Sequence, residues 1–281
     1  MNVKQFNRSI DIQEYLDGLR KNGMSIGFVP TMGALHKGHA SLIQKAKEEN
    51  DLVICSIFVN PLQFNRKEDL ENYPNRTKED ISLLNEFECD ILFLPSPEEL
   101  YQEKPDLNYD FGSIAVGMEA DFRPGHFQGV AAVIERFFTI LNPDRAYFGE
   151  KDYQQLAIVK WLVNLKGFST QVVGCPTIRF ENGLAMSSRN FNLSQEELET
   201  ASLIYQLMNY CKQHKEEKTP IQLMEHGLKQ LKNDFKTEYF QIVDEDTLKP
   251  IESWEDTERP RVFVAAYLST VRLIDNMSLI D

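Results

Sequence analysis

Two histidines three positions apart follow a short apolar run near the start of the chain. They belong to the segment Pro30-Thr-Met-Gly-Ala-Leu-His36-Lys-Gly-His39, and on the first turn of a helix they share one face. Gly33 and Gly38 let the backbone approach a ligand closely, and a helix N-terminus offers unpaired amides and a positive dipole end to phosphate. Two imidazoles beside bound phosphate can stabilise negative charge and protonate a leaving oxygen. The segment predicts phosphoryl or nucleotidyl transfer.

Two other interpretations of these histidines stay open at this level. Histidines are also ordinary polar residues at the start of a helix. A zinc site would take His126 as a third ligand, although the segment lacks the glutamate base of the H-E-x-x-H motif.

Two further segments combine a cation with glycine or hydroxyl groups. In Phe148-Gly-Glu-Lys151-Asp152 the glycine permits close backbone approach, the lysine suits a phosphate, and the aspartate suits a helix cap or a ribose hydroxyl. In Met186-Ser-Ser-Arg189 two hydroxyls and a guanidinium can clamp phosphate oxygens. Each segment alone is typical of a solvated turn, so their combination with the histidines is what indicates a nucleotide site.

Polar side chains also follow the apolar runs. They are Asn60, Gln63, Arg123, His126, Gln154 and Gln155. Amides recognise carboxylates and hydroxyls without adding charge. For any one of these residues a place in a surface loop is the more ordinary expectation.

The elements that must position these side chains alternate between strand and helix over the first two thirds of the chain. Apolar runs at 26–29 and 52–59 are typical of strands buried on both faces, and residues 40–47 between them have helical spacing. The alternation continues at 91–94, 130–141, 146–148, 152–165 and 172–173. In open parallel sheets ligands bind at the carboxyl ends of the strands, where the motifs lie. The pattern predicts an α/β fold with a doubly wound, Rossmann-like parallel sheet.

The pattern changes in the last third of the chain. In the first part of the chain, Thr77 looks like the N-cap of a helix with Asp80 in its first turn. In the last third, Ser194 opens a capping box and Thr219-Pro220 opens a further helix. Strands are then expected at 239–243, 262–268 and 271–274. Helices followed by strands predict a smaller α+β domain. We expect a Rossmann-like nucleotide-binding domain at 1–178 and a C-terminal lid domain at 179–281.

Composition excludes several classes of protein. The 281 residues include 30 basic and 43 acidic side chains, and the net charge of −13 argues against a nucleic-acid partner, although it leaves room for a local basic pocket. No apolar run approaches the ~18 residues that span a bilayer, and the N-terminus lacks the apolar core of a signal peptide. Four scattered cysteines form no C-x-x-C pair. We expect a cytoplasmic protein with reduced thiols and no membrane partner.

Taken together, the motifs resemble those of the pantothenate synthetase (pantoate–β-alanine ligase) family. The matching stretches are PTMGALHKGHASL, FVNPLQF, RPGHFQGV, NPDRAYFGEKDYQQL, GLAMSSRN and RLIDN. They occur in order from Pro30 to Asn276, whereas a lone H-x-G-H would indicate only the wider nucleotidyltransferase superfamily. The chain departs from the pattern where Arg76 is displaced by one place in Tyr73-Pro-Asn-Arg-Thr77, and where Ala120 and Asp121 replace a glycine.

The resemblance implies a two-step ligase. ATP and pantoate would give pantoyl adenylate and pyrophosphate, and β-alanine would then give pantothenate and AMP. Mg²⁺ would accompany ATP rather than occupy a protein cage. The resemblance also implies a homodimer. Two other functions are compatible with the residues alone: a nucleotidyltransferase that makes a dinucleotide, and a catalytically silent nucleotide-binding module.

The resemblance also implies the residues of the site. The expected ATP-binding residues are Met32, Gly33, Ala34, Leu35, His36, Lys37, Gly38, His39, Gly149, Glu150, Lys151, Asp152, Ile178, Met186, Ser187, Ser188 and Arg189. The catalytic side chains among them would be His36, His39, Lys151 and Arg189, with His39 the proton donor. Pantoate would bind to Gln63 and Gln155, and Asn60 would lie close to the β-alanine position.

Overall fold

The computed structural model describes residues 2–71 and 73–280, which form two compact units. Among the described residues, unit 1 comprises 2–71, 73–111, 123–150 and 155–176, and unit 2 comprises 112–122, 151–154 and 177–280. The division at residue 178 thus lies close to the last change of unit, but two earlier segments, Gly112–Phe122 and Lys151–Gln154, pack within unit 2. The assignment of 1–178 and 179–281 as separate domains stays a prediction.

Unit 1 is built from parallel strands and the helices that connect them. Its strands are β1 (Lys4–Phe6), β2 (Ile26–Thr31), β3 (Leu52–Ile57), β4 (Ile91–Phe93), β5 (Arg145–Gly149) and β6 (Gln171–Cys175). Its helices include α1 (Ser9–Arg20), α2 (Lys37–Glu49), η1 (Pro61–Gln63), α3 (Lys67–Glu71), α4 (Thr77–Glu86), α5 (Pro97–Leu100) and α7 (His126–Leu141). Where the chain enters unit 2 for the second time, η3 (Glu150–Asp152) leads into α8 (Tyr153–Lys166).

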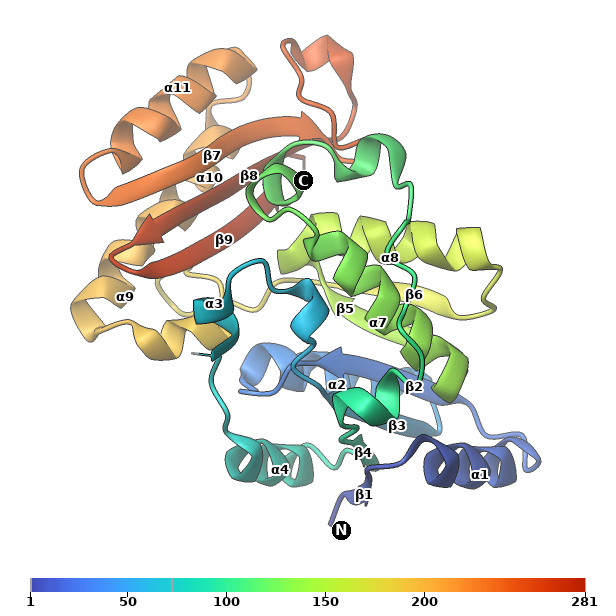
Figure 1. Cartoon of the computed structure of the whole chain (residues 1–281). Helices are drawn as coiled ribbons and strands as arrows, with labels where there is room; N and C mark the ends of the chain where they lie inside the picture. Colours follow the sequence, from blue (N-terminus) through green and yellow to red (C-terminus); the bar gives the residue numbers. More distant parts are fainter. Residues whose placement is uncertain (1, 72, 281) are drawn as a thin grey trace. The chain divides into compact units, whose positions relative to one another are not determined.

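The six strands form one parallel sheet in the order β1-β4-β3-β2-β5-β6 (Figure 1). Strand β2 pairs with β3 on one side and β5 on the other, so the strand order reverses beside β2. Ligands of doubly wound sheets bind at such a reversal, beyond the carboxyl ends of the strands. The histidine segment follows β2, and Gly149 ends β5. The predicted doubly wound sheet is confirmed.

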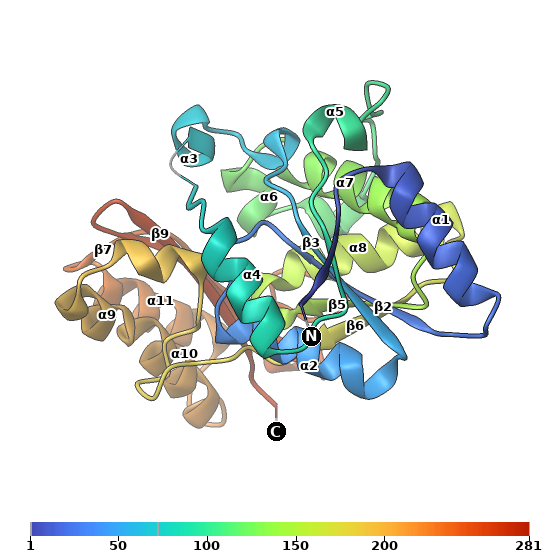
Figure 2. The ribbon, with the colours of Figure 1, turned by 90° about the horizontal axis from the view of Figure 1, so that it is seen from below.

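Helices cover both faces of this sheet because side chains of a strand alternate between its faces. Val29 of β2 packs with Leu42 of α2 and Leu84 of α4 in one core cluster. The neighbouring Phe28 points to the other face, where its ring centroid lies 5.4 Å from that of Phe137 on α7. Figure 2 shows α2 and α7 on opposite sides of the strands. The sheet is therefore buried on both faces, as its continuous apolar runs predicted.

Unit 2 is an α+β unit. Its strands β7 (Phe235–Asp244), β8 (Pro260–Leu268) and β9 (Val271–Ser278) form an antiparallel sheet in that order. Its helices are η2 (Gly112–Ala115), α6 (Met118–Phe122), η4 (Ser188–Asn192), α9 (Gln195–Ala201), α10 (Leu203–Gln213), α11 (Pro220–Leu231) and η5 (Trp254–Asp256). Ile204 of α10 and Leu223 of α11 pack against Val264 and Leu273 of the sheet. The predicted strands are confirmed, and β9 runs on through Asp275 and Asn276.

Two of the predicted helix starts are correct, and one predicted N-cap is not. Ser194 caps α9 through the predicted capping box, and Thr219 is the N-cap of α11, which begins at Pro220 as predicted. The prediction that Thr77 is an N-cap is wrong. Helix α4 begins at Thr77 itself, and the N-cap of the helix is Arg76, whose side chain makes no capping hydrogen bond. The Thr77 hydroxyl instead donates to Oδ1 of Asn75 at 2.9 Å, which removes it from the helix amides.

The four cysteines are free and buried. Burial raises the pKa of Cys175 to about 11 and that of Cys89 to about 12, so both remain thiols at neutral pH. Within the part of the chain that the structure describes, no helix is long and apolar enough to cross a membrane.

Candidate active site

The two histidines form the N-terminal cap of α2. Nδ1 of His36 accepts the N–H of Gly38 at 3.0 Å, and Nδ1 of His39 accepts the N–H of His36 at 3.3 Å. The centroids of the two rings are 4.2 Å apart. Because each Nδ1 acts as an acceptor, a neutral ring carries its proton on Nε2. The expected pair of imidazoles at a helix start is present, and each neutral ring is an Nε2–H donor.

Asp80 of α4 holds the turn that leads from β2 to these histidines. Its carboxylate oxygens accept the N–H groups of Ala34 at 2.9 Å and Leu35 at 2.7 Å. Gly33 and Ala34 have positive φ angles of 81° and 49°, and a Cβ on Gly33 would lie 3.0 Å from Oδ2 of Asp80. The turn therefore needs glycine at position 33. Asp80 is only 3% exposed, and burial raises the pKa of its carboxyl against the two N–H groups, which lower it.

The amide side chains after β3 form one hydrogen-bonded cluster. Nδ2 of buried Asn60 donates to the carbonyl of Gly129 at 2.9 Å and to Oε1 of Gln63 at 3.3 Å. Oδ1 of Asn60 accepts the hydroxyl of Tyr101 at 3.0 Å. In the second amide of the cluster, Nε2 of Gln63 donates to Sδ of Met32 at 2.8 Å. Asn60 thus fixes which way the Gln63 amide faces.

His126 and Arg123 support Gln63 from the backbone side. Nδ1 of His126 is 2.8 Å from the carbonyl oxygen of Gln63, and its Nε2 is 3.1 Å from Nη1 of Arg123. Because arginine only donates and a carbonyl only accepts, the proton of a neutral His126 ring sits on Nδ1. Both ring nitrogens therefore have protein partners. The zinc alternative finds no support, since no three His, Cys, Asp or Glu side chains of the described residues could hold a metal ion.

The neighbouring glutamines of α8 have different surroundings. Gln154 is buried in unit 2, where Oε1 accepts the N–H of Glu119 and Nε2 donates to the carbonyl of Ile114, both at 3.0 Å. Gln155 belongs to unit 1 and is partly exposed. Of the two, Gln155 is the residue with surface left for a ligand, and it is the one that the resemblance implied.

Two residues of the candidate nucleotide site face each other across a hairpin of unit 2. The N–H of Met186 donates to the carbonyl of Ile178 at 2.9 Å. The hairpin leads into η4, where the Ser187 hydroxyl accepts the N–H of Arg189 at 3.2 Å and the N–H of Ser187 donates to Asn190 at 2.5 Å. The backbone of the Ser-Ser-Arg turn is therefore fixed by the side chains of Ser187 and of Asn190, the residue that follows the turn.

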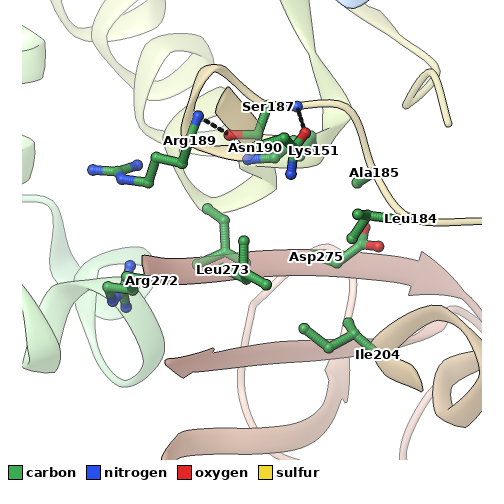
Figure 3. Close-up of a pocket in the computed structure, with 11 residues that line it drawn as sticks. Lys151, Leu184, Ala185, Ser187, Arg189, Asn190, Ile204, Arg272, Leu273 and Asp275 are labelled. Carbon is green, nitrogen blue, oxygen red and sulfur yellow. Dashed lines mark hydrogen bonds between the residues drawn. The ribbon is translucent and has the colours of Figure 1, made fainter. Parts of the chain in front are cut away.

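A cavity of about 10 Å³, room for about one water, opens beside this turn (Figure 3). Its polar lining consists of Lys151, Ser187, Arg189, Asn190, Arg272 and Asp275. Figure 3 shows Lys151 and Arg189 on one side of the cavity and Leu273 and Asp275 of β9 on the other. Lys151 and Arg189 bring positive charge to this cavity, whereas the guanidinium of Arg272 is paired with Glu119 and Glu238.

The expected ATP-binding residues thus fall into two sets. Met32, Gly33, Ala34, Leu35, His36, Lys37, Gly38, His39, Gly149 and Glu150 belong to unit 1. The second set, in unit 2, comprises Lys151, Asp152, Ile178, Met186, Ser187, Ser188 and Arg189. Asp80 was not among the expected residues, because an acid in a first helical turn is commonplace and its partners lie 45 and 46 residues away.

Comparisons with known proteins agree with the motifs. A family model described as pantoate–β-alanine ligase matches residues 4–278. This chain belongs to that family. The pantothenate synthetase of Cytophaga hutchinsonii is 46% identical over 265 residues, 93% of each chain. That of Porphyromonas gingivalis is 43% identical over 279 residues, 98% of this chain and 99% of the relative.

Solved structures of the family share the fold. The pantothenate synthetase of Thermus thermophilus matches with a TM-score of 0.91 at 38% identity, over 99% of this chain and 100% of that one. The Francisella tularensis ligase, complexed with β,γ ATP and β-alanine, matches with a TM-score of 0.82 at 36% identity, over 99% and 98%. Like its family, this chain is a ligase that makes pantothenate from pantoate, β-alanine and ATP. The dinucleotide-forming and catalytically silent alternatives are set aside.

Proposed function

We propose that this ligase works through bound pantoyl adenylate. A carboxylate oxygen of pantoate attacks the α-phosphorus of ATP, and the bond from that phosphorus to the bridging oxygen breaks, so pyrophosphate leaves. The amine of β-alanine then attacks the acyl carbon, AMP leaves with the former carboxylate oxygen, and the nitrogen loses a proton. The first nucleophile is already ionised at neutral pH, so this step needs positioning and charge stabilisation rather than a strong base.

In this proposal His36 and His39 act on the leaving phosphates. The support is their place at the N-terminus of α2, beyond the carboxyl end of β2, together with the proton that each neutral ring carries on Nε2. His39 donates its proton to the departing pyrophosphate, and His36 hydrogen-bonds beside it. The N-terminus of α2 adds the positive end of its dipole.

The remaining ATP contacts are proposed on chemical grounds. Lys151, Ser187, Ser188 and Arg189 bind phosphate oxygens; Lys151, Ser187 and Arg189 line one small cavity, and Ser188 belongs to the same short helix η4 as Arg189. The main chain of Ile178 and Met186 meets the adenine ring, and Gly149, Glu150 and Asp152 complete the nucleotide contacts. Mg²⁺ enters on the phosphates of ATP, because Mg²⁺ usually binds through substrate phosphates and water with few protein ligands. Bound there, the ion neutralises phosphate charge.

Pantoate is proposed to bind Gln63 and Gln155. The amide of Gln63 is held by Asn60 and its backbone by His126, so it is oriented before any substrate arrives. Such pre-orientation lowers the entropy cost of binding. Asn60, whose amide is bonded to Gln63, Gly129 and Tyr101, lies next to the β-alanine position in this proposal.

We also propose that the ligase is a cytoplasmic homodimer. The four buried free thiols suit a reducing compartment. The dimer rests on the family resemblance, and sedimentation equilibrium of the purified chain would test it: a monomer at micromolar concentration contradicts it.

The capped histidine pair is the observation that carries the adenylate mechanism, and the intermediate itself can be tested. With ATP, Mg²⁺ and pantoate but no β-alanine, pyrophosphate should appear in a burst of about one equivalent per site and then slow sharply, because the closed site keeps water from the mixed anhydride. Arg189→Ala should shrink the burst, since a charged clamp in a water-poor site is worth about 2–4 kcal/mol. Oxygen-18 in the pantoate carboxylate should appear in AMP after β-alanine is added. Pyrophosphate that forms only with β-alanine, or unlabelled AMP, would contradict the adenylate.

A further inference from the structure

The RLIDN stretch near the C-terminus has no part in the mechanism proposed above, yet two of its residues contact ATP-binding segments. Asp275 and Asn276 are adjacent in β9 and are 4% and 3% exposed. We infer that this pair is a positioning element that holds Lys151 and the Ile178–Met186 hairpin in the geometry that binds ATP. The inference rests on the ATP-binding roles proposed above for those segments.

Asn276 holds the backbone of Lys151. Its Nδ2 donates to the carbonyl oxygen of Lys151 at 2.9 Å. Its Oδ1 in turn accepts Nη1 of Arg261 at 2.6 Å, and Arg261 is fixed by Glu245 at 2.9 Å. The Asn276 amide therefore cannot rotate without losing a bond to a charged group. Lys151 is thus anchored at its carbonyl, which limits where its flexible side chain can reach.

Asp275 holds the hairpin through Arg179. Its two carboxylate oxygens accept both terminal nitrogens of the Arg179 guanidinium, at 2.6 and 3.0 Å. The same guanidinium donates to the carbonyl of Gly183 at 3.1 Å and stacks over the ring of Tyr205, 4.9 Å from its centroid. Gly183 has a φ of 89°, and a Cβ there would lie 2.0 Å from Tyr205. The hairpin tip is therefore tied to β9 by a bidentate ion pair.

The two contacts act on neighbouring parts of one ligand site. Lys151, Ala185 and Asp275 line the same small cavity, and the N–H of Asn276 donates to Oδ1 of Asp275 at 2.8 Å. Two adjacent residues of one rigid strand thus set the positions of the phosphate lysine and of the hairpin that carries Ile178 and Met186. A site built on a strand holds its geometry more tightly than one built on loops alone.

The sharpest test of Asn276 is Asn276→Asp, which keeps the shape and the acceptor for Arg261 but loses the donor to Lys151. Calorimetric titration with ATP and Mg²⁺ should show a dissociation constant raised about tenfold, the effect of losing one well-placed hydrogen bond. The control is Trp254→Phe, which also removes one side-chain N–H bond to a backbone carbonyl of unit 2, that of Lys218 at 2.8 Å. The control should lower the melting temperature without changing ATP affinity. If Asn276→Asp does not fold, Asn276→Ser removes the same donor without adding charge.

A double-mutant cycle separates positioning from general stability. In a Lys151→Ala background, Asn276→Asp should change ATP affinity by less than about twofold, because a residue that acts through Lys151 has nothing left to position. A full effect in that background overturns the inference, as does an Asn276 variant that resembles Trp254→Phe. If Lys151→Ala alone leaves ATP affinity unchanged, the proposed role of Lys151 fails first and the Asn276 inference fails with it.

The Asp275 contact has its own readout. Asp275→Asn keeps the shape but loses the charge that pairs with Arg179. Hydrogen exchange of the Met186 amide, which donates to Ile178, should become faster in Asp275→Asn and stay unchanged in Trp254→Phe. ATP affinity should fall at the same time. Faster exchange with unchanged affinity, or unchanged exchange, overturns the role of Asp275.

Discussion

The turn after β2 in unit 1 and the hairpin before Arg189 in unit 2 are held in place by different interactions. In the turn, side-chain acceptors take backbone N–H groups: Asp80 those of Ala34 and Leu35, and His36 that of Gly38. In the hairpin, by contrast, the guanidinium of Arg179 donates to a carboxylate and a carbonyl. The first device orients the backbone that leads to reacting groups, while the second braces a binding surface. Damage to the turn should therefore reduce the rate, whereas damage to the hairpin should reduce ATP affinity.

His39→Ala should break the turn side of this comparison most strongly. The loss of a proton donor and charge stabiliser at a leaving phosphate should lower kcat about 10²–10³-fold. The variant should stay folded, because a lost helix cap costs at most about 1–2 kcal/mol. Pyrophosphate release in the presence of pantoate measures the effect. The matched control is His214→Ala, which removes a ring stacked 3.9 Å from Tyr210 in unit 2 and should keep full turnover. A folded His39→Ala protein with near-normal turnover would show that His39 is structural.

Asp80→Asn tests whether the turn itself matters for the rate. The asparagine amide has one oxygen, which can accept only one of the two backbone N–H groups well, and its NH₂ group then faces the second N–H. A buried donor is left unsatisfied, which costs about 1–3 kcal/mol of stability. We expect kcat to fall about 10–100-fold with a smaller change in ATP affinity. Asp144→Asn is the matched control, since Asp144 accepts the N–H of Ile26 at 2.7 Å at the opposite end of β2. Equal kcat losses in both variants would contradict a role specific to the turn.

The pH dependence of Asp80 sharpens the same point. Burial raises the pKa of this carboxyl, with Arg76 opposing and Glu79 reinforcing the shift. As the pH falls, the folded protein therefore binds a proton on Asp80 before the unfolded chain does, so this group adds stability as the pH falls through its folded pKa. The same proton removes an acceptor from the turn. In the pH range where Asp80 takes up this proton, wild-type turnover should drop relative to that of Asp80→Asn. Over the same range the wild-type melting temperature should rise relative to that of the variant. Parallel changes in the two proteins would contradict the raised pKa of Asp80.

Gln63→Ala asks whether the amide cluster of unit 1 serves the acid substrate alone. The variant should weaken pantoate binding about tenfold and leave ATP binding nearly unchanged, because one oriented amide contributes about one hydrogen bond. Calorimetry with each substrate separately measures both constants. Equal losses for ATP and pantoate would remove Gln63 from the pantoate site.

Glu197→Gln should give the smallest effect, since it probes a solvent-exposed contact of unit 2. Hydrogen bonds from the Ser269 hydroxyl and from the N–H of Ser194 lower the pKa of Glu197. A carboxylate with a lowered pKa stabilises the fold above its ordinary pKa, and this contribution is lost as the pH falls through the lowered value. The variant should melt slightly below wild type at pH 7, and the difference should vanish in acid. A difference that grows in acid would contradict a stabilising contribution from the Glu197 carboxylate.

Periodicity and motif spacing predicted most of the fold. The continuous apolar stretch at 52–59 and the helical spacing between the strands were enough for a parallel sheet covered on both faces. The capping box at Ser194 and the Thr219-Pro220 pair marked helix starts correctly. Strand β1 was not predicted, because Lys4–Phe6 is short and mostly exposed and so lacks an apolar signal. Helix α7 begins at His126, four residues before the expected start at residue 130, and its N-cap is the left-handed Gly125.

The residues that hold the site were harder to predict than the residues that form it. His36 and His39 stand in one compact motif, whereas the partners of Asp80 and Asn276 lie 46 and 125 residues away. A hydrogen bond between distant segments leaves no periodicity in either one. For the same reason the sequence did not predict that Lys151–Gln154 belongs to unit 2. Nothing in the local pattern marks these four residues as part of another unit.

That brief passage of the chain through unit 2 bears on how such a protein can be recombined. A cut at residue 178 places Lys151 and Glu119 on one fragment, and Asn276 and Arg272, which bond to them, on the other. An exchange of the segment after residue 178 between two relatives would therefore pair a lysine from one parent with an asparagine from the other. The two must be inherited together, so the unit behaves as one module in space that the gene encodes in three separated pieces.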